Sequence, residues 1–391
     1  MSRHSLFATV LVLASLCSQP AMAAVIGGGS SSPLRLYTGT PALLPADFSY
    51  IGIGGGDEKA AFLTNAPVLL GLPLATSVDF AGSESLLTAS ELQTYNSTQS
   101  TSYGPLIQIP VAGMALAIPY KKSGTSTLQL TAAQLCDIFS GAISTWGAVL
   151  RNADTTPIKV IYRSGSSGST ELFTRFLNDS CPGRISVSSL LTQANFAPLP
   201  NHWQAVAGSA DVVAAVNAGE GTIGYVASEY LAPHNNATSA RVSKLPMAAG
   251  TAPLPTVANT RYALGYFPPP MTAMDRANPL KWVPSFGYGA GGQMPVPTQG
   301  NQYPIVGYTN LLIGQCYRDP ADAEAIRRFL GELYSLAKVP VIYQHFFVTV
   351  PQTASQMSGL AGEIRKVFLD NAYGDNLDIG NVNVCHGIGR P

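Results

Sequence analysis

One segment of the sequence joins an apolar strand pattern to a run of small residues and then to a helix pattern. The strand pattern ends at Arg163, and glycine and serine lead into an amphipathic helix that we expect to begin near Gly168. The first turn of a helix presents unpaired backbone N–H groups and the positive end of the helix dipole, so it attracts anions. The guanidinium of Arg163 can bind two oxygens of one anion. The segment predicts an anion site, with a capped helix and a solvated arginine as the alternative.

Three other segments are rich in small residues. Residues 26–34 carry three glycines and three serines; Pro33 suits the first turn of a helix that Ser32 can cap, and a frayed chain start is the alternative. Residues 52–57 form a glycine-rich turn that lacks the last glycine of a dinucleotide-binding loop. Glu84 lies among small residues, where an exposed surface glutamate is the ordinary alternative to a site residue.

The first 23 residues have the pattern of a secretory signal peptide. A basic start is followed by an apolar run over residues 6–16 and by Ala21 and Ala23, after which we expect cleavage. The apolar run is too short to span a bilayer, and no later run is long enough. Leu16 before Cys17 is bulkier than lipoprotein processing usually accepts. We therefore expect an exported protein without a membrane span, in the periplasm or outside the cell.

The charge balance argues against one large class of function. The chain has 22 basic and 22 acidic residues, and charged residues make up only 11% of it. A protein that binds nucleic acid needs a basic face, so we expect no nucleic-acid partner. The hydrophobic content of 46% and the length of the mature chain allow two domains, each with its own core.

Four cysteines remain after signal removal, at Cys136, Cys181, Cys316 and Cys385. An even number in an exported chain predicts two disulfides, for which three pairings are possible. We favour Cys136–Cys181 and Cys316–Cys385, because each joins cysteines of one sequence region. The chain has no Cys-x-x-Cys or His-x-x-x-His spacing, so we expect no zinc site and predict neither a metal nor a cofactor.

Short apolar runs rich in β-branched residues alternate with helical patterns. We expect strands at residues 106–120, 157–162, 222–226 and 304–313. We expect helices at residues 131–139, 168–177, 210–218, 321–336 and 360–369, and a capping box at Thr88 and Glu91 opens another. The alternation predicts an α/β fold with mostly parallel sheets. Residues 233–257 and 287–303 are rich in turn-forming residues and are predicted to be surface loops.

Longer motifs along nearly the whole mature chain resemble one known family. The motifs are Gly27-Gly-Gly29 with Pro33 and Tyr37, Tyr50-Ile-Gly52, Phe80-Ala-Gly-Ser83, Leu106-Ile-Gln-Ile-Pro110, Leu135-Cys-Asp-Ile-Phe-Ser-Gly141, Glu171-Leu-Phe-Thr-Arg-Phe-Leu177, Trp282-Val-Pro284 and the ending from Ile379 to Pro391. They are similar to those of the DING proteins, relatives of the periplasmic phosphate-binding component of ABC transporters. The Asp-Ile-Asn opening that names this family reads Ala24-Val-Ile26 in this chain.

The resemblance implies the two-lobed fold of type II periplasmic solute-binding proteins, in which crossover strands join two α/β lobes around a central cleft. We place the first lobe at residues 24–117 and 303–391 and the second at residues 118–302. The resemblance further implies a monomer that binds dehydrated phosphate in the cleft, and its disulfide pattern supports the pairing favoured above. The implied phosphate-binding residues are Arg163, Ser167, Gly168 and Ser169 in the second lobe, and Ser31, Ser32, Gly55 and Glu84 in the first.

Three positions depart from the family pattern. Gly55 replaces the usual serine of the glycine-rich turn, Glu84 replaces the usual aspartate, and Gly165 stands where many relatives have an acid that orients the arginine. In the family the aspartate accepts the proton of hydrogen phosphate and rejects fully ionised sulfate, since a carboxylate repels an anion unless the two share a proton. Glu84 keeps this chemistry but is one methylene longer, and we hypothesise that the small Gly55 makes room for it.

The resemblance leaves three functions open. The first is an exported phosphate-binding protein, with an ABC transporter or an outer-membrane secretion system as its protein partner. The second is a low-molecular-weight alkaline phosphatase or phosphodiesterase acting on phosphate esters, in which Arg163 would stabilise charge and Glu84 would act as a base. The sequence gives no confident catalytic residue, because it has no nucleophile elbow, no metal cluster and no histidine near these motifs. The third is an extracellular adhesion or interaction protein on the same fold.

The four histidines that follow the predicted signal peptide lie outside the candidate site motifs. We expect them to be structural or surface residues; they are His202, His234, His345 and His386.

Overall fold

The computed structural model describes residues 25–53, 59–195, 197–287, 292–351 and 359–391. The predicted signal peptide and Gly55 therefore lie outside the described residues. None of the helices in these described parts of the chain has the length and apolar character needed to span a bilayer.

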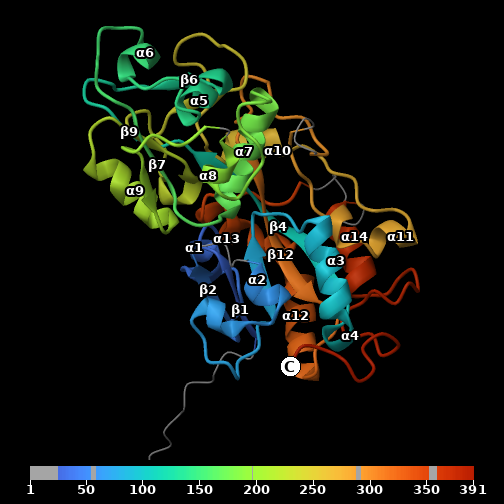
Figure 1. Cartoon of the computed structure of the whole chain (residues 1–391). Coiled ribbons are helices and arrows are strands. Elements are labelled where there is room, and N and C mark those ends of the chain that lie inside the picture. The colour runs from blue at the N-terminus through green and yellow to red at the C-terminus, as the bar shows by residue number, and fades with distance from the viewer. Residues whose placement is uncertain (1–24, 54–58, 196, 288–291, 352–358) are drawn as a thin grey trace, which may run out of the picture.

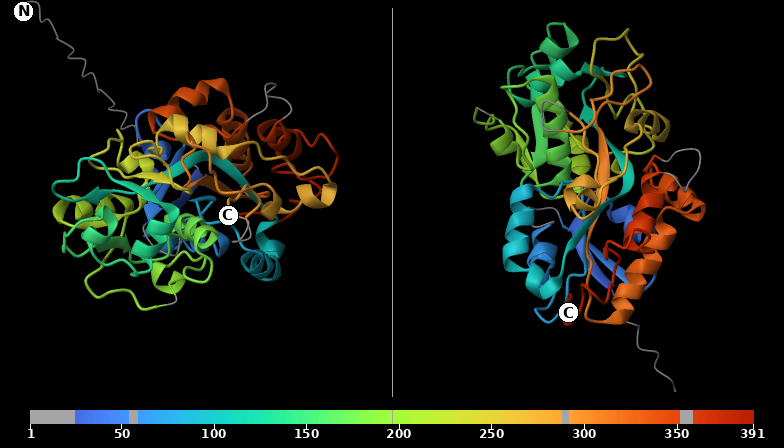
Figure 2. Two further views of the ribbon diagram at one scale, coloured as in Figure 1. Left: turned by 90° about the horizontal axis from the view of Figure 1, so that it is seen from above. Right: turned by 90° about the vertical axis from the view of Figure 1, so that its right-hand side faces the viewer.

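The described chain forms two lobes, each built on its own sheet. The first lobe has a six-stranded sheet in the order β10-β4-β12-β3-β1-β2, and the second has a four-stranded sheet in the order β5-β9-β7-β8. In the right-hand view of Figure 2, the green segments of the second lobe gather at one end of an elongated molecule and the blue and red segments of the first lobe at the other. The two-lobed α/β fold expected from the sequence is confirmed, while the residue numbers at which the lobes divide stay a prediction.

The strands have the following bounds: β1 Val25–Ser30, β2 Phe48–Ile53, β3 Phe80–Ser83, β4 Leu106–Ala117, β5 Tyr120–Lys121, β6 Gln129–Thr131, β7 Lys159–Arg163, β8 Gln204–Val206, β9 Thr222–Gly224, β10 Val226–Ala227, β11 Arg241–Ser243 and β12 Val306–Gly314. The strands that lead to the lobe interface run parallel, namely β1 with β2 and β3, and β7 with β8 and β9. The antiparallel pairs are β4–β12, β3–β12, β4–β10 and β5–β9.

Two long strands connect the lobes. Strand β4 is buried along its whole length and leads from the first sheet toward β5 of the second, and β12 returns and pairs with β4 from Val306 to Gly314. Figure 1 shows this pair near the centre of the molecule, between the helices of the two lobes. Apolar residues predominate in both buried strands, which is why β4 and β12 were predictable from the sequence.

The helices have the following bounds: α1 Leu34–Thr38, α2 Ala60–Leu63, α3 Ala89–Thr98, α4 Ser100–Tyr103, α5 Ala132–Phe139, α6 Trp146–Leu150, α7 Gly168–Ser180, α8 Leu191–Ala194, α9 Ser209–Ala218, α10 Val257–Leu264, α11 Ala273–Arg276, α12 Pro320–Leu333, α13 Val339–Gln344 and α14 Leu360–Phe368. One short 3₁₀ turn, η2 Ser228–Tyr230, matters for the site. The capping box at Thr88 and Glu91 opens α3 as predicted, and a second one at Thr131 and Gln134 opens α5.

The glycine-rich start of the mature chain differs from the expectation. Residues 25–30 form the buried strand β1, so the frayed-start alternative is wrong. The helix begins at Leu34 after Pro33, and Ser32 does not cap it because its hydroxyl bonds to Ser169 instead. The predicted surface loop at 233–257 also contains one strand, β11, which pairs with β6.

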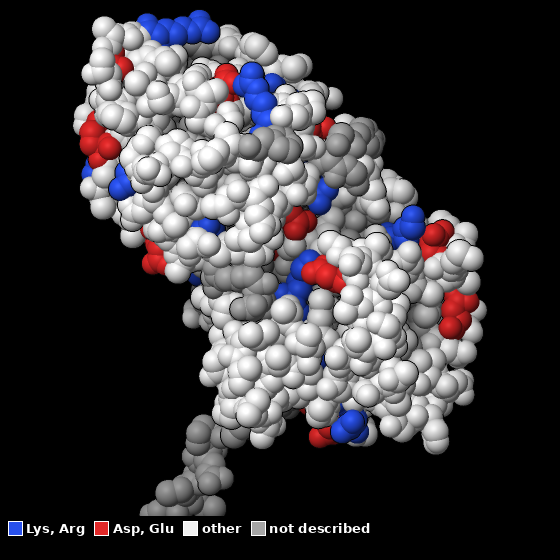
Figure 3. All heavy atoms as spheres, viewed as in Figure 1, with Lys and Arg blue, Asp and Glu red and all other residues white. Residues whose placement is uncertain are grey.

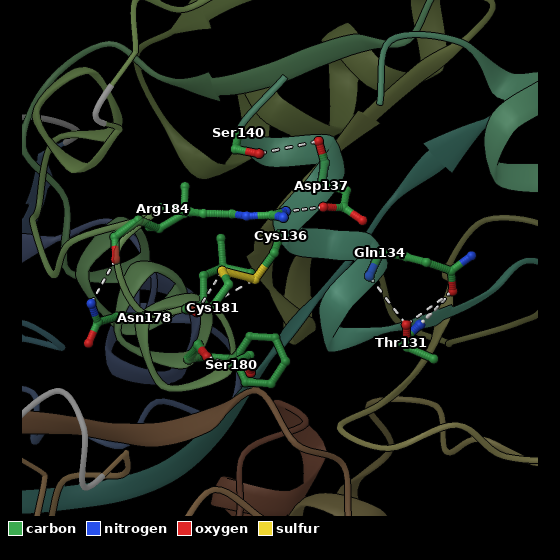
Figure 4. Close-up of a disulfide and its surroundings, with 12 residues drawn as sticks. Thr131, Gln134, Cys136, Asp137, Ser140, Asn178, Ser180, Cys181 and Arg184 are labelled. Atoms are coloured by element: carbon green, nitrogen blue, oxygen red, sulfur yellow. Dashed lines mark hydrogen bonds and ion pairs between the residues drawn. A yellow bond between two sulfur atoms is a disulfide. The ribbon is translucent and has the colours of Figure 1, made fainter. Parts of the chain in front are cut away.

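Both predicted disulfides are present. Cys136–Cys181 joins α5 to the end of α7, and Figure 4 shows Arg184 reaching Asp137 beside it. Cys316–Cys385 joins the segment just after β12 to the C-terminal segment. Each bridge lies within one lobe, so neither one holds the two lobes together.

The C-terminal segment is anchored by a buried arginine. Arg390 is fully buried, donates from Nη1 to the carbonyl of Val78 at 2.9 Å, and stacks on the ring of Phe62 with 3.6 Å to the ring centroid. Asp79 is buried close by, and burial raises the pKa of its carboxyl, although the N–H of Ile26 donates to it at 2.8 Å. Arg390 thus fastens the C-terminal segment to the residues just before β3.

We expect Arg390→Met to lower the melting temperature by about 4 °C, because losing the buried guanidinium costs about 3 kcal/mol. Differential scanning calorimetry measures this shift. The matched control is Arg365→Met, whose side chain is 57% exposed and forms a surface ion pair with Asp370, and it should shift the melting temperature by about 1 °C or less. Equal shifts for the two variants would contradict the anchoring role.

Candidate functional site

Arg163 is positioned at the end of β7, five residues before α7 begins. Its side chain is only 2% exposed, so the solvated alternative is wrong. Its Nε donates to the carbonyl of Ala207 at 2.7 Å. The guanidinium is thereby buried and fixed with its positive charge at the lobe interface.

The start of α7 offers a buried hydroxyl without a protein partner. Ser167 is the N-cap residue, but its side chain makes no capping bond, and its buried Oγ has no hydrogen-bond partner among the described residues. Its backbone N–H is satisfied by the carbonyl of Ser189 at 2.8 Å. A buried hydroxyl without a partner is unfavourable, so a ligand oxygen at this helix start would stabilise it.

Ser31 and Ser32, which follow β1, contact serines of the second lobe. The hydroxyls of Ser32 and Ser169 lie 2.7 Å apart, and those of Ser31 and Ser209 lie 3.1 Å apart. The hydroxyl oxygen of Ser30, the last residue of β1, accepts a hydrogen bond from the backbone N–H of Ser32 at 3.2 Å. Ser32 and Ser169, which were predicted to bind from opposite lobes, therefore meet in the structure, whereas Ser31 meets Ser209, which was not predicted.

Glu84 follows β3 directly and lies at this same junction. It is 5% exposed, so the surface alternative is wrong. Its Oε2 accepts a 2.5 Å hydrogen bond from Ser30 Oγ, while its buried Oε1 has no partner in the parts of the chain that the structure describes. Burial raises the pKa of the Glu84 carboxyl, although nearby hydroxyls and the charge of Arg163 oppose the shift. A buried carboxyl with a raised pKa and one unpartnered oxygen can exchange a proton with an anion.

The lobes touch closely at Gly168. A Cβ at this position would lie 2.7 Å from the backbone N of Ser85 and 2.8 Å from Cβ of Glu84. The hydroxyl of Ser85 also donates to the carboxylate of Glu171 in α7. Only a residue without a side chain allows α7 to approach Glu84 in this way, so Gly168 is required by a close approach of two backbones.

A narrow pocket continues on one side of Glu84. It is lined by residues of both lobes, including Arg175 and Phe176 of α7 and Tyr308 of β12. The cavity volume is about 30 Å³, so only small groups fit in this arrangement. Figure 3 shows a largely uncharged face with a few basic and acidic side chains side by side at the waist of the molecule.

None of the histidines among the described residues lies in this site. His202 bonds to the carbonyl of Ile158, and His345 bonds to that of Pro41. His234 packs against Phe346, and burial lowers the pKa of His234 to about 4. Among the described residues no group of three or more His, Cys, Asp or Glu side chains is placed to hold a metal ion.

Several residues of this site were missed from the sequence. Ser30 holds Glu84, and Tyr50 fixes Ser30 by donating to its carbonyl at 2.7 Å. Tyr230 donates to the carbonyl of Ser31 at 2.6 Å, and Glu229 beside it is buried. The serine run gave a signal for Ser30, whereas nothing in the local sequence singles out residues 229 and 230, which the fold brings in from β10.

Comparison with known proteins gives a consistent family. Residues 42–337 match the model of the PBP superfamily domain. A protein of Pseudomonas aeruginosa strain PAO1 named alkaline phosphatase L is 43% identical over the full length of both chains, and a protein of an unknown prokaryotic organism named phosphate-binding protein is 39% identical over 93% of this chain and 99% of its own.

Solved structures agree with this family. A high-affinity periplasmic phosphate-binding protein of the DING type, solved with bound phosphate, shares 39% identity, covers 94% of this chain and 99% of its own, and superposes with a TM-score of 0.84. The crystal structure of another DING protein shares 37% identity over 94% of this chain and 100% of its own, also with a TM-score of 0.84.

We expect Gly168→Ala to favour an open arrangement of the lobes, because its Cβ would collide with the backbone of Glu84 and Ser85. Small-angle X-ray scattering should show an increase of about 1 Å over a radius of gyration of about 21 Å for a chain of this size. The matched control is Gly331→Ala in α12, where the nearest atom to an added Cβ lies 3.8 Å away. An unchanged radius in Gly168→Ala would show that this contact does not govern closure.

Proposed function

Because the chain belongs to the PBP superfamily, as a member of its DING group, we propose that it is an exported phosphate-binding protein whose interlobe site captures inorganic phosphate. One observation carries the proposal. The structure buries a fixed guanidinium, Arg163, and a carboxyl with a raised pKa, Glu84, between hydroxyl groups of the two lobes. A hydrogen phosphate ion has the matching features, since it carries both negative oxygens and a proton.

Each proposed ligand residue has a defined role. Arg163 supplies the positive charge, and Ser167, Gly168 and Ser169 supply donors at the start of α7. Ser31 and Ser32 supply hydroxyls from the first lobe, which would turn from their present partners Ser209 and Ser169 to the anion. These exchanges replace one hydrogen bond by another, so they cost little.

Glu84 gives the site its selectivity in this proposal. Its unpartnered Oε1 would accept the ligand's proton, or donate its own, and sulfate at neutral pH has no proton to share. The longer side chain that replaces the family's aspartate is held in place by Ser30. The compensating room at Gly55 remains part of the proposal, because Gly55 lies outside the described residues.

The proposal extends to location and partners. The protein would be released from its signal peptide into the periplasm or the medium and would act as a monomer. Its protein partner would be an ABC transporter that receives the phosphate or an outer-membrane secretion system that exports the chain.

A second candidate function is hydrolysis of phosphate esters. The full-length similarity at 43% identity to a protein named alkaline phosphatase L favours it. Arg163 could stabilise developing charge and Glu84 could transfer a proton. The described residues supply neither a metal cluster nor a histidine for the reaction, and the narrow pocket beside Glu84 leaves little room for an ester substituent. Capture of inorganic phosphate is therefore the better-supported function.

Titration calorimetry of phosphate into the mature protein, freed of bound anion, tests this function. We expect tight one-to-one binding in the wild type and a loss of about 30-fold or more in Arg163→Met, since removing one partner of a buried charged contact costs about 2 kcal/mol or more. The control Arg184→Met removes an arginine whose side chain is 55% exposed and should bind as the wild type does.

The same preparations are tested with p-nitrophenyl phosphate. Binding of phosphate without turnover of the ester supports the proposed function. Turnover that Arg163→Met abolishes, together with weak phosphate binding in the wild type, would overturn it in favour of the phosphatase.

A further inference from the structure

A second buried carboxyl lies at the lobe interface with no evident structural purpose. Glu229 belongs to η2, the short turn that follows β10, and it is 5% exposed. Both of its carboxyl oxygens are buried and have no hydrogen-bond partner within the described ranges. A carboxyl in this condition is costly to keep, particularly in its ionised form, so its presence calls for an explanation.

The neighbours of Glu229 place it beside the proposed anion site. The next residue, Tyr230, donates to the carbonyl of Ser31, and Arg35 of α1 lies over the Tyr230 ring at 4.6 Å from the ring centroid. Ser31 in turn contacts Ser209 at the start of α9. The turn that carries Glu229 is therefore fastened to the same serine segment that faces α7.

Two charged groups act on Glu229 from the elements around it. Arg35 attracts its carboxylate through its charge and its backbone N–H, and Glu84, which follows β3, repels it. Burial is the larger effect, and together with Glu84 it raises the pKa of Glu229 well above its usual value. Tyr230, on the same turn, lies within electrostatic range of Glu229, Arg35, Glu84 and Arg163.

We propose that Glu229 is a second acidic residue of the anion site and must carry its own proton before phosphate can bind between the lobes. The inference rests on the proposed phosphate-binding function. Glu84 can share the proton of the ligand, whereas Glu229 has no described partner to share with. When Glu229 is ionised, binding must draw one proton from solvent onto its carboxylate, which becomes a neutral carboxylic acid.

The sign of the pH effect follows from repulsion between like charges. An ionised Glu229 repels the anion, so phosphate affinity falls as the pH rises through the pKa of Glu229. This loss adds to any pH dependence that comes from Glu84 and from the ligand itself. Glu229 thus makes the affinity for phosphate higher in acidic surroundings than in alkaline ones.

The test compares wild-type protein with Glu229→Gln, which is neutral at every pH and nearly the same shape. Phosphate is titrated calorimetrically between about pH 6 and about pH 9, in buffers of different ionisation enthalpy that report the protons taken up. We expect Glu229→Gln to bind phosphate about tenfold more tightly than the wild type at the alkaline end and to take up about one proton fewer there.

The control is Glu220→Gln, which removes an exposed acid that pairs with Lys122 on the second lobe, and it should retain the wild-type pH profile. A wild-type protein that binds phosphate with the same profile and proton uptake as Glu229→Gln would overturn the inference and leave the proposed function standing. Failure of every variant and the wild type to bind phosphate at any pH would overturn the proposed function itself.

A second readout avoids substitution. Infrared difference spectra of the wild-type protein, with and without phosphate at alkaline pH, should show a gain of the protonated carboxylic acid band on binding. Absence of this gain, where calorimetry shows that phosphate does bind, would contradict the role of Glu229.

Discussion

The site depends on burying a carboxyl and a guanidinium together where the two lobes meet. Glu84 and Arg163 are almost fully buried, and buried ionisable groups are costly unless their surroundings compensate them. Ser30 compensates one oxygen of Glu84, and the carbonyl of Ala207 holds Arg163. Glu84 Oε1 and Ser167 Oγ make no hydrogen bond with the described residues, and an anion that carries a proton could bond to both.

The closed arrangement of the lobes follows from small residues around this pair. Gly168 lets the start of α7 reach the backbone of Glu84 and Ser85, and the serines after β1 meet their counterparts without crowding. Glu229 extends the principle, because it adds a carboxyl that tolerates a neighbouring anion only when protonated.

The sequence predicted those features that depend on local pattern. Strands β4 and β12, the main helices, the capping box at Thr88 and both disulfides follow from apolar runs, caps and cysteine positions. The candidate anion site at Arg163 and α7 was suggested by the sequence because strand end, serines and helix start are contiguous, and it stays a prediction. Features created by tertiary contact were missed. Strand β1 is glycine-rich and lacks β-branched residues after Ile26, yet it pairs between β2 and β3 because the sheet can use its bare backbone. Glu229 and Tyr230 lie near the site because β10, which precedes them, pairs with β4 of the first sheet.

The most direct test is a crystal structure of the mature protein with phosphate at atomic resolution. The account predicts one phosphate ion between the start of α7 and residues 31–32, in contact with Arg163. A Glu84 oxygen should lie about 2.5–2.7 Å from a phosphate oxygen, as expected for a shared proton. Phosphate bound elsewhere, or Glu84 turned out of the cleft in the complex, would contradict the account.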